Sequence, residues 1–292
     1  MKTLVFGSLN IDLIFPVDHI VLPGETIAGG DLVKSAGGKG ANQAAALAKA
    51  GLEVYLAGKI GQDGRFLLSL LNSYGVDTSL VAEYEGATGQ AIIQVDRGGQ
   101  NAIVLYAGGN ARIAAEEIDR TLALFGTGDI LVLQNEINRL PEIMEKAVER
   151  GMKVCLNPSP YDEKIGSLPL DRVDVFFVNE IEAAALAGLP AAPPPEILEA
   201  LVKRFPRAEI VLTAGKDGAL YGHGETRARG EIIDLPVVDT TGAGDTFTGY
   251  FTAARARGLP PGESLRIACK ASSIAVSRPG AMAAVPAAAE VF

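Results

Sequence analysis

The segment from Val238 to Phe247, with sequence VDTTGAGDTF, combines a turn of small residues with an acidic side chain. It leads directly into a helical pattern over residues 246–257. Backbone amides in such a turn can surround an anion at the amino-terminal end of the helix, where the helix dipole favours negative charge. Asp245 then has two interpretations. It stabilises the helix end by less than about 1 kcal/mol, or it acts as a general base beside an anion hole.

Three further groups of polar residues have spacings that leave their roles open. Residues 37–43 (GGKGANQ) depart from the Walker phosphate-binding pattern, and no dinucleotide-binding glycine pattern follows the first apolar run. Alone, such a glycine run is typical of a loop that enters a helix. Asn10 and Asp12 could cap a turn or bind sugar hydroxyls. Asn179 and Glu182 stand where a helix begins, so they could simply cap it.

Apolar runs and helical patterns alternate along most of the chain. Alternation of this length implies parallel neighbouring strands, so the pattern predicts an α/β fold with a doubly wound, mostly parallel sheet flanked by helices. We interpret the Pro-rich run 191–195 as a surface connection within one domain, residues 1–292. We expect strands at 2–7, 53–58, 76–83, 129–134, 153–157, 174–178 and 208–213, and helices at 39–51, 63–74, 140–150, 180–188, 195–205 and 246–257.

Two segments, residues 12–34 and 87–107, interrupt this alternation. Both contain strand patterns punctuated by glycine, with no helical pattern between them. Asp96–Gly99 separates two apolar runs, as a hairpin turn does. Antiparallel strands inserted here would either extend the main sheet or form a small lid over its ligand crevice. We favour the lid.

Composition excludes several classes of function. The chain has 26 Lys and Arg against 35 Asp and Glu, a net charge of −9, which lacks the positive charge that binding to nucleic acid or to an anionic membrane needs. Two cysteines and two histidines are too few for the usual zinc or iron–sulfur ligation. Cys155 and Cys269 lie in apolar runs, as reduced thiols of a cytoplasmic protein do. No secretory signal or long apolar segment stands out, so we expect a cytoplasmic protein.

Seven short motifs follow one another along nearly the whole chain: residues 7–12 (GSLNID), 23–26 (PGET), 37–43 (GGKGANQ), 157–158 (NP), 179–182 (NEIE), 213–215 (TAG) and 239–247 (DTTGAGDTF). In this order they resemble the ribokinase/phosphofructokinase-B (PfkB) family of carbohydrate kinases. The resemblance implies a ribokinase-like fold and transfer of the ATP γ-phosphate to the exocyclic primary hydroxyl of a free pentose, with D-ribose as favoured acceptor and ribose 5-phosphate as product.

The resemblance also implies roles for individual residues. Asp245 would be the base that takes the proton of the attacking hydroxyl, and the amides of Gly242, Ala243 and Gly244 would hold the transferred phosphoryl group. Glu182 would orient water on Mg²⁺. The matching sugar-binding positions are Asn10, Asp12, Gly38, Lys39, Asn42, Glu136 and Asp245. The nucleotide-binding positions are Asn179, Thr213, Gly215, Lys216, Gly218 and Gly244. A loop for a monovalent cation such as K⁺ matches Asp239, Thr241, Ala275, Arg278 and Gly280.

Residues 12–34 and 87–107 match the β-lid of that family, which often forms a dimer interface as well. A small sheet needs something to cover its second face, and a second copy of the lid would do so symmetrically. We therefore expect a homodimer joined through the lids, with Ile92 and Ile103 in the shared surface. Two departures from the family, at Cys269 and Ala284, leave the nucleotide preference and the strength of K⁺ dependence open.

Other acceptors remain as alternatives. The same fold could serve a ketohexose, a deoxy sugar acid or a nucleoside. Nucleoside kinases hold a base with apolar or aromatic lid residues, and the lid segments offer few of them beyond Phe15, Ile20, Tyr84 and Tyr106. A catalytically silent sugar sensor would have no need of Asp245 beside an intact glycine turn. A free sugar and ATP are therefore the expected ligands.

Overall fold

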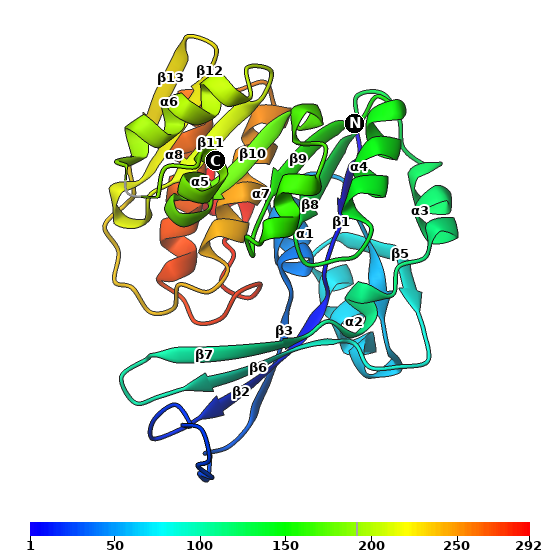
Figure 1. The fold of residues 1–292 in the computed structure, drawn as a ribbon, viewed down its shortest axis with the longest axis vertical. Helices are drawn as coiled ribbons and strands as arrows, with labels where there is room; N and C mark the ends of the chain where they lie inside the picture. The colour runs from blue at the N-terminus through cyan, green and yellow to red at the C-terminus, as the bar shows by residue number, and fades with distance from the viewer. Residues whose placement is uncertain (191) are drawn as a thin grey trace.

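A nine-stranded sheet forms the centre of the computed structural model, which describes residues 1–190 and 192–292. Its strands are β1 (Thr3–Phe6), β4 (Val54–Ile60), β5 (Val76–Glu83), β8 (Ile130–Gln134), β9 (Lys153–Asn157), β10 (Val175–Asn179), β11 (Glu209–Thr213), β12 (Ala219–His223) and β13 (Thr226–Gly230). Their spatial order is β13-β12-β11-β10-β9-β8-β1-β4-β5 (Figure 1).

The strands from β11 to β5 in this order are parallel, and β12 and β13 add an antiparallel edge. Every residue of β1 and β8 is buried, because helices cover both faces of a parallel sheet. The predicted doubly wound sheet is confirmed. The antiparallel strands β12 and β13 were not predicted.

Two layers of helices enclose two apolar cores. One core lies under α1 (Lys39–Lys49), α2 (Arg65–Ser73), α7 (Ala243–Ala256) and α8 (Pro261–Val276). The other lies under α3 (Ala115–Leu122), α4 (Leu140–Glu149), α5 (Glu180–Ala187) and α6 (Pro194–Arg204). A short helix, α9 (Ala288–Val291), packs beside α8. No helix among residues 1–190 and 192–292 is long and apolar enough to cross a membrane.

Three details of the helices differ from expectation. Helix α7 begins at Ala243 rather than at residue 246, so the glycine turn is its first turn. Helices α3 and α8 were not predicted. Within the Pro-rich run, residue 191 lies outside the described residues, and α6 begins at Pro194.

Four strands form a separate sheet, which projects from the body as a lid (Figure 1). They are β2 (Asn10–Pro16), β3 (Val33–Gly37), β6 (Gly89–Val95) and β7 (Asn101–Tyr106), in the order β3-β2-β6-β7. A lid is thus confirmed over a plain extension of the main sheet. The turn at Asp96–Gly99 is confirmed too: the Asp96 amide donates to the Gln100 carbonyl oxygen at 2.9 Å, and Gly99 has φ +79°.

The expectation of a purely antiparallel lid is wrong. The central pair β2–β6 is parallel, whereas β2–β3 and β6–β7 are antiparallel. The reason lies in the main sheet: β2 continues from β1 and β6 follows β5, and these parallel strands release the chain at the same edge in the same direction. Residues 17–32, where strand patterns were expected, contain no strand.

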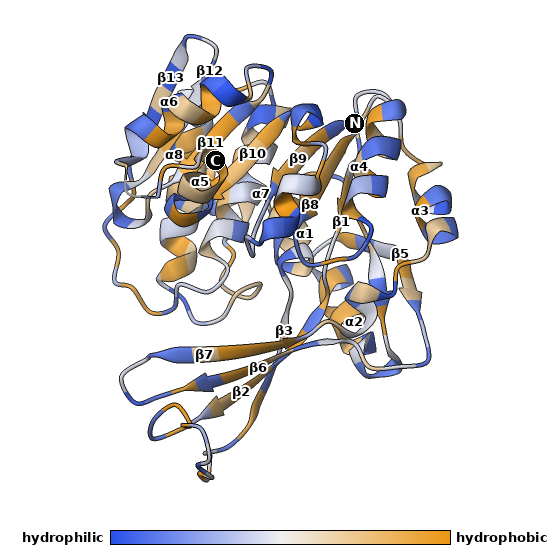
Figure 2. Cartoon of the chain, viewed as in Figure 1, coloured by the Kyte–Doolittle hydropathy of each residue, from blue (hydrophilic) through white to orange (hydrophobic). Residues whose placement is uncertain are grey.

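The lid strands are largely hydrophobic (Figure 2), and their register places apolar side chains on both faces of the lid. Ile93 lies opposite Ile103, and Ile92 lies opposite Val104, so Ile92 and Ile103 are on opposite faces and do not form one surface as expected. The face that carries Asp12, called the Asp12 face below, also carries Ile14, Val33, Ile93, Ile103 and Leu105.

Candidate active site

The polar residues singled out in the sequence meet at the carboxyl-terminal edge of the parallel strands. Asn179 ends β10, Thr213 ends β11, and Glu136 follows β8. Asn10 begins the lid strand that continues from β1. Ligands of open α/β sheets bind outside this edge. The amino-terminal turn of α7 brings Asp245 to the same place.

Asp245 is buried at the beginning of α7, and helix α1 holds both of its carboxylate oxygens. Asn42 Nδ2 donates to Asp245 Oδ2 at 3.0 Å, and Gln43 Nε2 donates to Asp245 Oδ1 at 2.9 Å. The two helices approach closely because Gly249 of α7 faces Ala46 of α1, where a Cβ atom would overlap. The carboxylate is thus fixed in direction, and each oxygen keeps a second lone pair for a ligand.

The turn before Asp245 presents backbone amides at the end of α7. Gly242 has φ +74°, and a Cβ there would lie 3.0 Å from Ala281 Cβ, so the turn requires glycine. The amide of Ala243 donates to the Thr240 carbonyl oxygen at 3.3 Å. Those of Gly242 and Gly244 donate to no carbonyl oxygen of the described chain, which leaves them available to an anion.

A cavity of about 440 Å³ opens over this turn. It receives side chains from α1, from the ends of β10 and β11, and from α7. Backbone amides at the start of a helix and a lysine side chain, both present in this lining, are groups that bind phosphate. Its lining includes Lys39, Asn179, Glu182, Thr213, Gly215, Thr240, Gly242, Ala243, Gly244 and Asp245.

Thr213 and Gly215 are the members of the predicted nucleotide loop that reach this cavity. Lys216 is exposed beside it. Gly218 has φ +86° and turns the chain into β12, where a Cβ would overlap the Gly230 carbonyl oxygen. Gly218 therefore has a structural reason to be glycine that is independent of a ligand.

Asn179 and Glu182 cap helix α5. The Glu182 amide donates to Asn179 Oδ1 at 2.9 Å, and the Asn179 amide donates to Glu182 Oε2 at 3.1 Å. This reciprocal pair is a capping box, so the capping interpretation of the sequence is confirmed for both residues. Capping uses one oxygen of the Glu182 carboxylate, and the residue lines the cavity at the same time.

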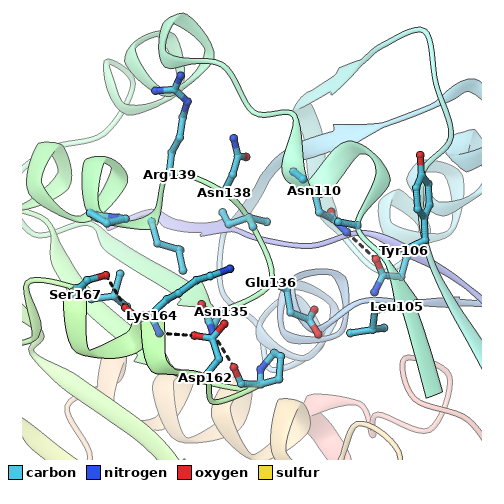
Figure 3. A pocket seen from close by; sticks show the side chains of 18 residues that line it. Leu105, Tyr106, Asn110, Asn135, Glu136, Asn138, Arg139, Asp162, Lys164 and Ser167 are labelled. Carbon is cyan, nitrogen blue, oxygen red and sulfur yellow. Dashed lines mark hydrogen bonds between the residues drawn. The ribbon is translucent and has the colours of Figure 1, made fainter. Parts of the chain in front are cut away.

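A second cavity, of about 650 Å³, lies between the end of lid strand β7 and the loop after β8 (Figure 3). Asn10 and Glu136 line it. So does Asn110, which the sequence analysis missed: its Nδ2 donates to Asn10 Oδ1 at 2.7 Å, and its Oδ1 accepts the Leu9 amide at 3.0 Å. Gly89 makes room for this pair, because a Cβ there would overlap both side chains.

Asp12 points from lid strand β2 over Gly37, where a Cβ atom would overlap its carboxylate. Burial, and next the negative charge of Glu136, raise the pKa of Asp12 to about 6. Gly38 has φ +94° and turns the chain from the lid into α1. Gly37 of the GGKGANQ motif thus makes room for the lid carboxylate, and Gly38 makes the turn between the lid and α1.

Glu136 and Lys39 join the two cavities. Glu136 Oε2 accepts the Lys39 amide at 3.1 Å and the Ser8 hydroxyl, and burial raises the pKa of Glu136. Burial disfavours the charged form of Lys39, but the carboxylates of Asp245, Glu136 and Glu182 outweigh it and raise the lysine pKa. A fixed positive charge therefore stands among carboxylates where the two cavities meet.

The residues expected around a monovalent cation do lie together, behind the glycine turn. Asp239 Oδ1 accepts the Thr241 amide and Oδ2 accepts the Gly280 amide, each at 2.9 Å. Burial opposes ionisation of Asp239, but these hydrogen bonds outweigh it and lower the pKa. The Arg278 amide donates to the Ala275 carbonyl oxygen at 3.0 Å. The Arg278 guanidinium pairs with Glu290.

Comparison with known proteins agrees with this architecture. A family model described as pfkB family carbohydrate kinase matches residues 2–288. The chain is 34% identical over 294 residues to a ribokinase of Arabidopsis thaliana, covering 97% of this chain and 78% of that protein. It is 31% identical over 258 residues to a deoxyribokinase of Salmonella typhi, covering 86% of this chain and 84% of the relative.

A solved structure is similar over its full length. Arabidopsis thaliana ribokinase complexed with ribose and ATP superimposes with a TM-score of 0.89 at 31% identity, covering 99% of this chain and 97% of that one. The similarity extends over both sheets, since almost the whole of each chain is covered.

Proposed function

Because the chain belongs to the pfkB family of carbohydrate kinases, we propose that it transfers the γ-phosphate of ATP to the exocyclic primary hydroxyl of D-ribose, giving ribose 5-phosphate. One observation carries the proposal. The carboxylate of Asp245, held by two amides, stands beside a turn of free backbone amides and close to a second cavity lined by polar side chains. The proposed place of action is the cytoplasm, where ATP is abundant and thiols such as the buried Cys155 and Cys269 stay reduced.

The side chains on the sugar side suit a small polyol. Asn10 and Glu136 line the cavity of about 650 Å³, and together with Asp12 and Asn42 they offer both hydrogen-bond donors and acceptors. Their arrangement would bring one hydroxyl to the unused lone pairs of Asp245. Asp245 would accept the hydroxyl proton while the hydroxyl oxygen forms its bond to the γ-phosphorus, the bond from that phosphorus to the β,γ-bridging oxygen breaks, and ADP leaves.

The cavity of about 440 Å³ over the glycine turn would hold the triphosphate of ATP. Gly242 and Gly244 line this cavity and their amides would bind the phosphate, and we propose that the Ala243 amide joins them when its weak turn hydrogen bond opens. Lys39 would neutralise charge that spreads over the transferred phosphoryl oxygens. Asn179, Thr213, Gly215, Lys216 and Gly218 are proposed to flank the nucleotide.

Two metal ions complete the proposal. Mg²⁺ neutralises charge on the nucleotide phosphates when bound. Glu182 fits a water-mediated role toward it, because Mg²⁺ commonly keeps several waters and needs few protein ligands. A monovalent cation, K⁺ in the proposal, would be held by carbonyl oxygens of the loops around Asp239, Thr241, Ala275, Arg278 and Gly280. Its contribution there would be to order the glycine turn.

The lid supports a dimer. Val33, Ile103 and Leu105 on the Asp12 face are 50%, 52% and 54% exposed. A four-stranded sheet that leaves such side chains in water lacks a cover for them. We propose that the lid of a second copy covers this face, in a symmetric homodimer.

A nucleoside is a second candidate acceptor, favoured by the size of the cavity between β7 and the loop after β8, where the sugar is proposed to bind. About 650 Å³ exceeds the volume of a pentose, and Leu105, Tyr106 and Leu140 line the cavity beyond the polar residues. These side chains could contact a base. Ribose remains the first proposal because the chain is 31–34% identical to proteins named ribokinase over nearly its full length.

The test is ADP release with Mg²⁺, K⁺ and ATP over a panel of acceptors: D-ribose, 2-deoxy-D-ribose, D-fructose, a 2-keto-3-deoxy sugar acid and inosine. We expect kcat/KM to be at least about tenfold higher for D-ribose, and NMR to place phosphate on C5. Asp245→Asn, purified in parallel, controls for a contaminating kinase. A higher kcat/KM for another acceptor would replace ribose, and no ADP release with any of them would refute the proposal.

A further inference from the structure

Two buried glutamines form a chain of hydrogen bonds behind Asp245. Gln134 ends strand β8 and Gln43 lies in α1, and both side chains are completely buried. Gln134 Nε2 donates to Gln43 Oε1 at 2.6 Å. Gln43 Nε2 in turn donates to Asp245 Oδ1 at 2.9 Å. Strand β8 is thereby connected to the Asp245 carboxylate through two side-chain amides.

We propose that Gln43 is a positioning residue for the base, and that Gln134 fixes the direction of the Gln43 amide. The proposal rests on the proposed function, in which Asp245 takes the proton of the acceptor hydroxyl. Neither glutamine touches the reacting atoms. Both act through the orientation of one carboxylate.

The direction of the Gln43 amide decides whether it holds or repels Asp245. An amide has a donor end and an acceptor end of nearly equal size. If the Gln43 amide were reversed, its Oε1 would face Asp245 Oδ1, and two acceptors would be in contact. The Gln134 Nε2 group prevents this reversal. It is a donor, so it forms a hydrogen bond only when the acceptor end of the Gln43 amide, Oε1, faces it.

The stability of the fold does not explain why a glutamine is buried at position 134. Its Oε1 atom is buried and has no hydrogen-bond partner among the residues that the structure describes. A buried acceptor without a partner costs free energy, whereas an apolar side chain of similar shape would not. The fold also keeps residue 7 free of a side chain at this point, since a Cβ on Gly7 would overlap the Gln134 amide.

The two amides from α1 leave the carboxylate prepared for its reaction. Asn42 and Gln43 each occupy one lone pair, on different oxygens of Asp245. The plane of the carboxylate is then set by two donors rather than one. A hydroxyl that enters from the sugar side meets a lone pair with a fixed direction, and correct direction is a large part of catalysis.

The first experiment removes each amide without changing side-chain size much. For Gln43→Met and Gln134→Met we expect kcat to fall at least about tenfold, while Kd values for sugar and ATP, measured by calorimetry, change less than about threefold. Thr252→Val is the matched control. It removes a buried hydroxyl that has no partner in the described chain, on the same helix as Asp245. Its kcat should equal that of the wild type.

The direction of the amide is tested by Gln134→Glu. This variant keeps the shape but puts an acceptor opposite Gln43, so the Gln43 amide should reverse. We expect a larger loss of kcat than for Gln134→Met, with thermal unfolding measured to exclude loss of the fold. Equal or smaller loss in a folded variant would overturn the role of Gln134.

A double-mutant cycle separates action through the base from independent damage. In the Asp245→Asn background, Gln43→Met should reduce kcat less than about twofold further, because residues that act as one unit are not additive. The inference would be overturned if the double variant lost kcat by the product of the two single fold-losses. It would also be overturned if a folded Gln43→Met enzyme kept more than half of the wild-type kcat. Wild-type protein without kinase activity would instead refute the proposed function.

Discussion

Replacing Asp12 by asparagine should make the ligand-free protein more stable at neutral pH. The carboxyl has an ordinary pKa of 3.8, and its pKa in the folded protein is about 6. Between these values the folded state binds more protons than the unfolded state, so stability falls as the pH rises from about 4 to above 6. One pKa unit corresponds to about 1.36 kcal/mol, so the full shift corresponds to about 3 kcal/mol.

Asparagine keeps the shape and carries no charge, so Asp12→Asn should lose this pH dependence. At pH 7.5 we expect the variant to unfold at a temperature about 5 °C higher than the wild type. At pH 4, where Asp12 is protonated in both states, the difference should vanish. Asp31→Asn, an exposed position in the same lid, is the control and should show neither effect.

The same substitution should weaken sugar binding. A hydrogen bond to a charged group contributes about 1.5–3 kcal/mol, so the Kd for sugar should rise about 10- to 100-fold while that for ATP stays nearly constant. Calorimetry with each ligand measures the Kd values for sugar and ATP, and thermal unfolding at several pH values measures the pH dependence of stability. A variant that is less stable than the wild type at pH 7.5, or a stability difference that persists at pH 4, would refute the reasoning.

Three further outcomes follow from the site and the lid. Asp245→Asn should lower kcat at least about 100-fold in the ADP-release assay while sugar affinity changes little; retention of more than a tenth of kcat would make another group the base. Activity should be higher in K⁺ than in Na⁺ or choline at equal ionic strength, and equal rates in all three would remove the proposed cation from the loop around Asp239. Ile103→Asp with Leu105→Asp on the Asp12 face should convert a dimer into monomers in sedimentation, whereas Val104→Asp on the opposite face should not; a wild-type monomer at micromolar concentration would contradict the lid dimer.

The main sheet could be predicted because its strands are short apolar runs that differ clearly from the helical patterns beside them. Helix α8 was missed because its buried face consists largely of small residues such as Ala268 and Ala271, which give a weak apolar pattern. Strand β13, with sequence TRARG, has no apolar alternation at all. Its pairing with β12 follows from its position in the sheet rather than from its composition.

In the site, motifs revealed the residues that carry charge or fix a turn, and they did not reveal partners far away in the sequence. Asn110 contacts Asn10 across a hundred residues, and a lone asparagine after a strand carries no signal of that contact. Gln134 is the last residue of a predicted strand, where a polar side chain is ordinary. The parallel pairing of β2 with β6 was missed for the same reason, since it depends on where β1 and β5 end.

That parallel pairing also constrains the order in which the chain can fold. Asn10 and Gly89 are far apart in the sequence and pair where the strands β1 and β5 end. Contacts between such distant segments form slowly. We therefore expect β2 to pair with β6 after β1, β4 and β5 have assembled, and the lid to be a late element of folding. Until it forms, the β6–β7 hairpin has an unpaired edge at β6, and such an apolar edge is prone to aggregation.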